Sequence, residues 1–386
     1  MTTVMMDEDA DHEPATLGTD EPDVLDSRGD LYLQVGGDVE KKPKTYLVCS
    51  KALARASTVF EKMLYGGFAE SRPADAVHKH WTVELPDDRQ EPTELLLHIA
   101  HGRFNRVPGQ LELTQLYQFL VMVDKYDAAG AIRPWARGWL EGAQAATQNP
   151  LLLGVAYQLG DLPTFDIMAR KIAAECLVDG DEDLVFGYSG NDRETYSYKL
   201  RNMEYLVPPG LLDDTASARM TLLTTMLEPY VGLYMTLKHG NRCPSSPQDP
   251  MSGRRCDSIL LGSLIRSFAA QGIDLAATDP AAEYRGSAAT LQAILPRLEL
   301  YTAHTGFVTH PSSAPSLFSP LTSPHAFGQV SHPLFGFGPT TCEQVLQATL
   351  REGLERSLLL GGQVSFAKPR HGEYLRKQAS KTGLAK

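Results

Sequence analysis

The chain has 386 residues, of which 42% are hydrophobic and 22% charged, values typical of a soluble globular protein of two or three domains. Its net charge of −11, without a basic stripe, argues against nucleic acid or an anionic membrane surface as the main partner. Five scattered cysteines do not suggest a disulfide framework, and we find neither a signal peptide nor an apolar run of roughly eighteen residues. We therefore expect a protein of the nucleus or cytoplasm.

Both ends of the chain are strongly charged, with opposite signs. The first thirty residues hold ten acidic residues against one base, Arg28. Residues 1–22 are predicted to be a disordered acidic tail, because they cannot bury enough apolar surface to offset ordering. Residues 361–386 carry six basic residues against Glu373 and are predicted to be a solvated basic tail.

The first structured elements are expected from residue 31 onward. Apolar alternation predicts strands over residues 31–35, 45–48 and 81–85, the first two joined as a hairpin. Short helices are expected over 51–55 and 59–64, the second capped by a hydroxyl at position 57 or 58. The following turn contains three acidic residues, which we expect to be solvated: Glu84, Asp87 and Asp88.

Helical spacing continues after Pro92. Apolar residues recur at helical intervals over 95–99, 113–123 and 132–140. The predicted core of this region includes Phe60, Leu64, Leu120 and Trp135.

The chain beyond residue 145 is predicted to be mainly α-helical, with few strand signals. A helical domain is expected over 146–302, followed by a disordered loop rich in Pro, Ser, His and Phe over 303–341 and a helix over 342–360. Within the helical domain the candidate helices are 151–159, 163–177, 216–238, 257–272 and 288–299.

Several stretches of the first 143 residues resemble one known family. They are Gly29–Val35, Ser50–Leu64, His101–Phe104, Asp124–Asp127 and Arg133–Ala136. Their sequences and their order are similar to those of BTB/POZ domains, in the form found in filamentous fungi. The resemblance implies an α+β fold over residues 23–143, a small sheet capped by helices, followed by a mainly α-helical C-terminal region. Two positions depart from the family pattern, since Ser50 replaces a histidine and Thr58 replaces a proline.

The resemblance implies protein–protein interaction as the function. BTB domains self-associate, and by resemblance Asp30 and Lys51 lie near the interface of a homodimer. The alternative for these two residues is local, with Asp30 capping a strand and Lys51 solvated. In the family at large the fold also docks a cullin, which makes the chain a candidate substrate adaptor of a ubiquitin ligase. The alternative function is that of a transcriptional or scaffolding regulator with no ligase role.

The partner-binding surface implied by this resemblance draws on Glu94, His98 and Phe104. An exposed Phe104 would serve as an aromatic anchor for a partner. The alternative, which the sequence slightly favours, turns the ring inward against Leu116 or Leu120.

No motif for catalysis or phosphate binding occurs, so we expect neither an enzyme nor a cofactor. The resemblance to fungal extensions suggests that Cys243, Cys256 and Cys342 together with a histidine bind zinc. Because His332 lies far from Cys342 in the sequence, we favour loop thiols without a metal.

Overall fold

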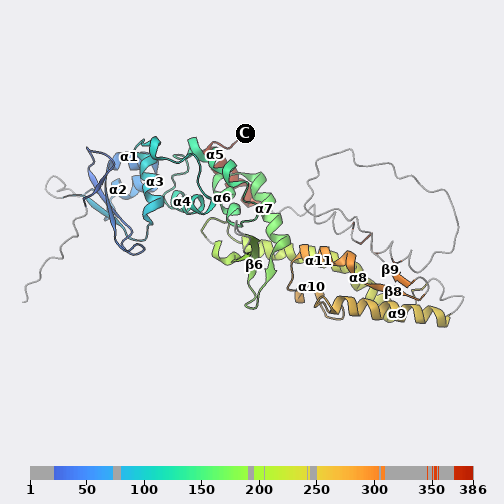
Figure 1. Cartoon of the computed structure of the whole chain (residues 1–386). Coiled ribbons are helices and arrows are strands. Elements are labelled where there is room, and N and C mark those ends of the chain that lie inside the picture. The colour runs from blue at the N-terminus through green and yellow to red at the C-terminus, as the bar shows by residue number, and fades with distance from the viewer. Residues whose placement is uncertain are drawn as a thin grey trace, which may run out of the picture. The chain divides into compact units, whose positions relative to one another are not determined.

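The computed structural model shows an α+β protein (Figure 1). It describes residues 21–72, 80–189, 195–203, 205–240, 242–243, 250–303, 306–308, 346, 350, 352–353, 355 and 369–385. The chain forms two compact units, unit 1 with residues 1–108 and 122–132, and unit 2 with residues 109–121 and 133–386. The predicted acidic tail lies outside the described residues, apart from Glu21 and Pro22.

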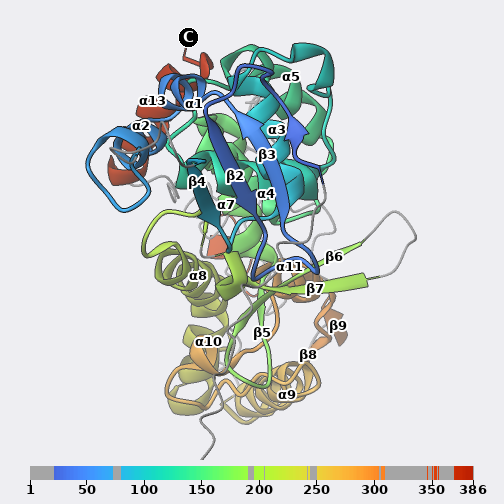
Figure 2. The same cartoon turned by 90° about the vertical axis from the view of Figure 1, so that its left-hand side faces the viewer.

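The sheet of unit 1 has the strand order β1-β3-β2-β4. Its strands are β1 (Asp23–Val24), β2 (Leu31–Val35), β3 (Lys44–Val48) and β4 (Thr82–Leu85). The predicted hairpin is confirmed, because β2 and β3 pair antiparallel, whereas β4 lies parallel to β2 (Figure 2). The alternating residues of β2 are fully buried, as the period of two requires: Leu31, Leu33 and Val35.

The helices of unit 1 follow the predicted order. They are α1 (Ser50–Ala56), α2 (Thr58–Tyr65), α3 (Gln90–Ala100) and the 3-10 turn η1 (Phe104–Arg106). Ser57 caps α2, since its hydroxyl accepts a hydrogen bond from the Phe60 amide at 3.0 Å. The adjacent Thr58 hydroxyl donates instead to Asp127. Helix α4 (Leu113–Lys125) contributes residues to both units.

Unit 2 is built mainly from helices, as the sequence predicts. They are α5 (Arg133–Ala143), α6 (Leu151–Leu159), α7 (Leu162–Glu175), α8 (Leu211–His239), α9 (Pro250–Ala269), α10 (Pro280–Glu283) and α11 (Ala288–Ile294), with 3-10 turns η2 (Leu200–Met203) and η3 (Leu295–Arg297). The long helix α8 contributes a stripe of buried residues to one cluster with α9 and α11. None of the described helices is both long and apolar enough to cross a membrane.

Two small sheets of unit 2 were not predicted. The first contains β5 (Leu177–Val178), β6 (Leu184–Ser189) and β7 (Thr195–Lys199), and the second pairs β8 (Leu300–Thr302) with β9 (Gly306–Val308). These strands are short, and Gly187 interrupts the apolar alternation of β6. Strand β9 also lies inside the segment predicted as a disordered loop, so that prediction was wrong for residues 306–308.

The predicted basic tail was wrong for residues 369–382, which form helix α13 (Pro369–Thr382). One side of this helix is buried: His371, Leu375, Gln378, Ala379 and Thr382. Gly160 permits this packing, because a Cβ atom there would lie 2.2 Å from the Ala379 nitrogen. The basic residues cover the opposite side of an amphipathic helix, so a count of charges concealed the buried stripe.

Most of the predicted core of the first 143 residues is confirmed. Phe60, Leu64 and Leu120 are at most 1% exposed, whereas Trp135 is only half-buried. In the segment predicted as a helix over 342–360, the five described residues are helical, and Leu346 and Leu350 join the core cluster of unit 2.

Candidate interaction surface

Glu94 lies at the centre of a polar cluster on unit 1. Its carboxylate accepts hydrogen bonds from Lys44 Nζ at 2.7 Å and from Tyr46 Oη at 3.2 Å, both from β3. Its other oxygen lies 3.5 Å from Nε2 of His98, one turn further along α3. Two of the three predicted partner-binding residues, Glu94 and His98, therefore lie side by side.

The electrostatics of this cluster favour a charged Glu94 and a neutral His98. Burial raises the pKa of Glu94, but the hydrogen bond and charge of Lys44 outweigh it and hold the pKa below its ordinary value. Burial also lowers the pKa of His98, assisted by the positive charges of Arg103 and Arg106 and opposed by Glu94. The Nδ1 atom of His98 is buried and has no hydrogen-bond partner among the described residues. The imidazole is therefore held mainly by packing and by Glu94.

Phe104, the third predicted residue, is exposed. Its side chain is 59% exposed, so the inward orientation favoured by the sequence was wrong. The ring belongs to the 3-10 turn η1, none of whose residues is buried. Gly102, with a φ of 70°, lies in the turn that ends α3, where the Arg103 amide donates to the His98 carbonyl at 2.9 Å. The Arg103 guanidinium donates to the Val24 carbonyl at 2.6 Å, which anchors the turn to β1. The exposed ring is flanked in the sequence by Arg103 and Arg106.

The two predicted interface residues, Asp30 and Lys51, do not contact each other through an ion pair in the described structure. The Asp30 carboxylate accepts hydrogen bonds from the Ser50 amide at 2.8 Å and from its hydroxyl at 2.7 Å, which stabilises the first turn of α1. The hydroxyl of Ser50, at the position of the family's histidine, therefore has a defined structural role. Lys51 is exposed. A role for either residue in a dimer stays a prediction.

Asp88 corrects the expectation of a solvated turn. Its side chain is only 3% exposed and accepts hydrogen bonds from Lys125 Nζ and Tyr126 Oη. The Tyr126 ring stacks on Phe60, with 4.2 Å between ring centroids, and the Ser57 hydroxyl donates to the Tyr126 carbonyl. Burial and the charge of Asp88 raise the pKa of Tyr126. Lys125 and Tyr126 thus tie the Asp88 turn to α2.

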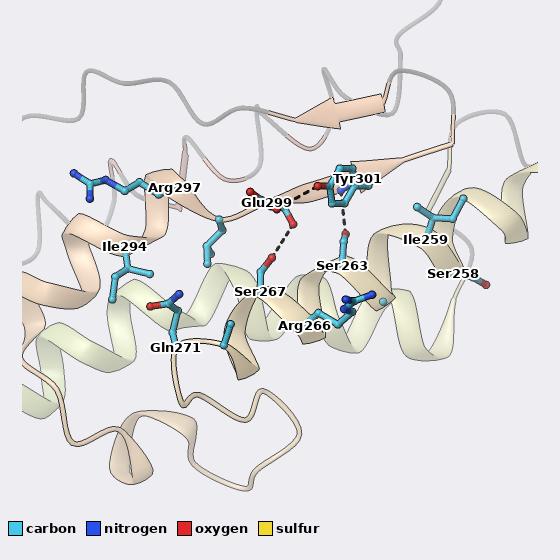
Figure 3. A pocket seen from close by; sticks show the side chains of 13 residues that line it. Ser258, Ile259, Ser263, Arg266, Ser267, Gln271, Ile294, Arg297, Glu299 and Tyr301 are labelled. Carbon is cyan, nitrogen blue, oxygen red and sulfur yellow. Dashed lines mark hydrogen bonds between the residues drawn. The ribbon is translucent and has the colours of Figure 1, made fainter.

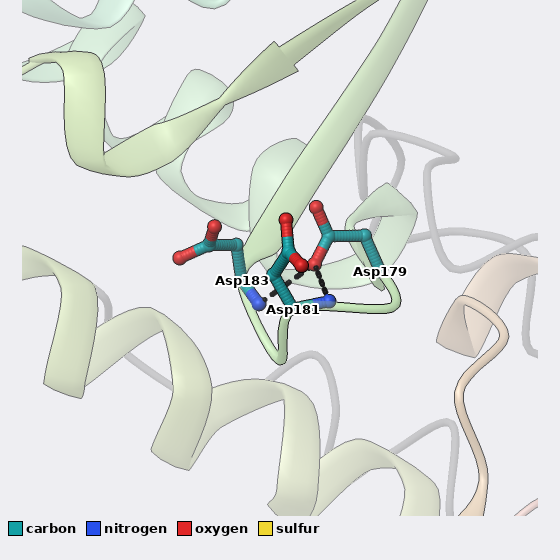
Figure 4. A group of neighbouring side chains, drawn as sticks. All are labelled: Asp179, Asp181 and Asp183. Atoms are coloured by element: carbon teal, nitrogen blue, oxygen red, sulfur yellow. Dashed lines mark hydrogen bonds between the residues drawn. The ribbon is translucent and has the colours of Figure 1, made fainter.

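Sequence reasoning also missed an acidic cluster in unit 2. Carboxylate oxygens of Asp179, Asp181 and Asp183 lie within 4.8 Å of one another, on the turn between β5 and β6 (Figure 4). The Asp-x-Asp-x-Asp spacing was the available signal. Lys199 Nζ lies 3.0, 2.9 and 2.9 Å from the three carboxylates, so an ammonium group already occupies the position of a cation. Its hydrogen bond lowers the pKa of Asp179. The cluster is explained by this ion pairing.

A groove of about 880 Å³ runs between α9 and the segment leading into β8 (Figure 3). Two serines of α9 hydrogen-bond to the backbone at β8. Ser267 donates to the Glu299 carbonyl, and Ser263 accepts from the Tyr301 amide. Arg266 and Arg297 are exposed at this groove. Its lining mixes polar and apolar side chains, and the Tyr301 hydroxyl donates a hydrogen bond to the Glu299 carboxylate at 3.2 Å.

The cysteines considered for zinc are partly brought together. Cys243 and Cys256 are buried and form a small cluster of their own. Cys342 and His332 lie outside the described residues. Cys256 lies inside α9, so the expectation of a loop thiol was wrong for this residue. A structural zinc site needs four ligands, and zinc binding stays a prediction.

Comparisons with family models, curated proteins and solved structures give no match. The resemblance to BTB/POZ domains therefore rests on the residues quoted above and on the order of the elements.

Proposed function

We propose that this chain is a protein–protein interaction module built on a BTB/POZ-type domain over residues 23–143. The order of elements from β2 to α5 is the order that the resemblance predicts. The stretches that carry the resemblance also contact one another, since Ser57 and Phe60 pack on Tyr126. This agreement supports the fold assignment.

The observation that carries the proposal is the exposed Phe104. Large aromatic side chains are enriched in the parts of interfaces that contribute most to affinity. Arg103 and Arg106 flank Phe104 in the sequence, and the cluster around Glu94 belongs to the same unit. This surface fits a partner with an apolar pocket and acidic residues at its rim. We propose that a cullin is this partner, which makes the chain a substrate adaptor.

Affinity purification of the tagged chain, with mass spectrometry of co-purified cullin and ring-finger subunits, tests this function. Phe104→Ala should abolish retention of the cullin while leaving the melting temperature nearly unchanged, because the ring is already largely in water. Phe68→Ala is a matched control, since Phe68 is another exposed phenylalanine of unit 1, 62% exposed. It should keep the partner.

The alternative function is a transcriptional or scaffolding regulator with no ligase role. Recovery of other proteins through Phe104, without any cullin, would replace the adaptor role by this one. If wild type and Phe104→Ala retain partners equally, Phe104 is not part of a partner-binding surface.

Self-association forms a separate part of the proposal. By resemblance the two copies meet near Asp30 and Lys51, and Lys51 is exposed. Lys51→Glu should weaken a dimer measured by sedimentation at micromolar concentration, without loss of stability. Asp30→Asn is less clean, because Asp30 also stabilises α1 through Ser50. A monomer across the whole concentration range would contradict self-association.

A further inference from the structure

The net charge of this protein is concentrated in one short part of the chain. The first thirty residues carry −9 of the total of −11, so the other residues together carry only −2. Helix α13 departs from this near balance, because it holds four basic residues and one acidic residue, Glu373. The four are Arg370, Arg376, Lys377 and Lys381.

The packing of α13 determines which of these charges are displayed. The Tyr374 ring stacks on Tyr157 with 4.3 Å between centroids, and the Thr382 hydroxyl donates to the Leu159 carbonyl at 2.7 Å. With this side of the helix held against α6, Arg376 and Lys377 are exposed on the other side. Their charges therefore point away from the core of unit 2.

Helix α5 adds two further bases beside α13. A Cβ atom at Gly383 would lie only 2.8 Å from Nε of Arg133, so the start of α5 lies against the end of α13. Arg137 follows Arg133 by one helical turn, and both are exposed. We call Arg133, Arg137, Arg376 and Lys377 the basic face.

The helix dipole does not account for this basic face, because its effect is confined to the first and last turns of a helix. Arg376 and Lys377 lie in the middle of α13, whose last turn holds Lys381 instead. Arg133 begins α5, where a positive charge opposes the dipole, and Arg137 lies beyond the first turn of α5. Among the described residues none of the four makes an ion pair, whereas Arg370 pairs with Asp214 at 2.7 Å. The basic face therefore lacks its complementary charge within the described structure.

We propose that the basic face is the docking site for the acidic segment of residues 7–21 of a second copy. This segment holds seven acidic residues and no lysine or arginine: Asp7, Glu8, Asp9, Asp11, Glu13, Asp20 and Glu21. Each copy then carries both a donor segment and an acceptor face, and opposite charges steer the two together. The contact adds a salt-dependent component to the proposed self-association and rests on that proposal.

Binding of a fluorescent peptide of residues 1–22 to the full chain tests the basic face. The affinity read from fluorescence anisotropy should fall at least roughly tenfold in Arg376→Glu/Lys377→Glu, and also when the salt rises from about 50 to 500 mM. The exchanged pair Arg376→Lys/Lys377→Arg preserves the charge and should bind as wild type does. A peptide with Asn and Gln at the seven acidic positions should not bind. Melting curves verify that the variants are folded, which the exposure of both positions predicts.

Mixing two variants tests whether the segment comes from a second copy. One chain carries Arg376→Glu/Lys377→Glu, and the other carries the seven neutralised acidic residues. Each variant alone lacks the contact, while the mixture restores one acceptor and one donor. We expect sedimentation at about 50 mM salt to show association in the mixture beyond that of either variant alone.

Three outcomes overturn the inference. If the peptide does not bind, or if it binds wild type and Arg376→Glu/Lys377→Glu equally, the basic face is not its site. Peptide binding without restored association in the mixture places the segment on its own copy and removes the second copy. Association through unit 1 should persist in both variants and at about 500 mM salt. Its absence would contradict the proposed self-association, while peptide binding still reports on the basic face.

Discussion

Asp88 of unit 1 and the aspartate cluster of unit 2 differ in burial and in the number of partners for each carboxylate. Asp88 is one buried carboxylate with two donors, Lys125 and Tyr126. Asp179, Asp181 and Asp183 are three carboxylates around one ammonium group, that of Lys199, and Asp181 is 77% exposed. A buried polar group must have partners because water is not available to it, whereas exposed charges are screened. The number of ion pairs is therefore a poor guide to stability.

The largest expected loss of stability comes from Phe60, whose ring stacks on the tyrosine that donates to Asp88. Phe60 is 1% exposed and stacks on Tyr126, so Phe60→Ala removes buried ring surface and leaves a cavity. We expect a loss of roughly 3–5 kcal/mol in the free energy of unfolding, measured by urea denaturation. A loss below about 1 kcal/mol would show that this ring is not part of the core.

Asp88→Ala tests the buried carboxylate directly. It leaves the Tyr126 hydroxyl without its acceptor in a buried position, and we expect a loss of roughly 1–3 kcal/mol. The double variant with Tyr126→Phe should lose less than the sum of the single changes, because the orphaned hydroxyl is removed as well. Additive losses in this cycle would contradict the coupling between Asp88 and Tyr126.

His98 makes the stability of unit 1 depend on pH. Its folded pKa lies below the ordinary value of 6.5, since burial disfavours the charged ring. The contribution of the neutral His98 ring to the free energy of unfolding is present above pH 6.5. It is lost as the pH falls through the folded pKa, because the unfolded chain binds the proton more readily. Between pH 7.5 and 5, the urea midpoint should fall more steeply for wild type than for His98→Gln. Parallel curves would exclude His98 as the source.

Asp181→Asn should give the smallest effect. Lys199 keeps two other carboxylates, at 3.0 and 2.9 Å, and Asp181 is mostly in water. We expect a change below about 0.5 kcal/mol in the free energy of unfolding. A loss as large as that of Asp88→Ala would contradict the distinction drawn between the two sites.

The sequence determined the elements whose residues interact with near neighbours. Apolar residues at every second position predicted β2. Apolar residues three or four positions apart predicted α6 and the middle of α8. Capping by Ser57 was also visible, because the hydroxyl and the amide that it caps are three positions apart. These features depend on local backbone geometry and little else.

Only the tertiary structure decided the environment of individual polar and aromatic residues. Asp88 is buried because Lys125 and Tyr126, far along the chain, return to it. Helix α13 is packed because Gly160 leaves room for Ala379, although the segment's composition suggests a solvated tail. Phe104 is exposed in the 3-10 turn η1, none of whose residues is buried. For Asp88 and α13, burial depends on residues that are distant in sequence, and a local pattern contains no information about them.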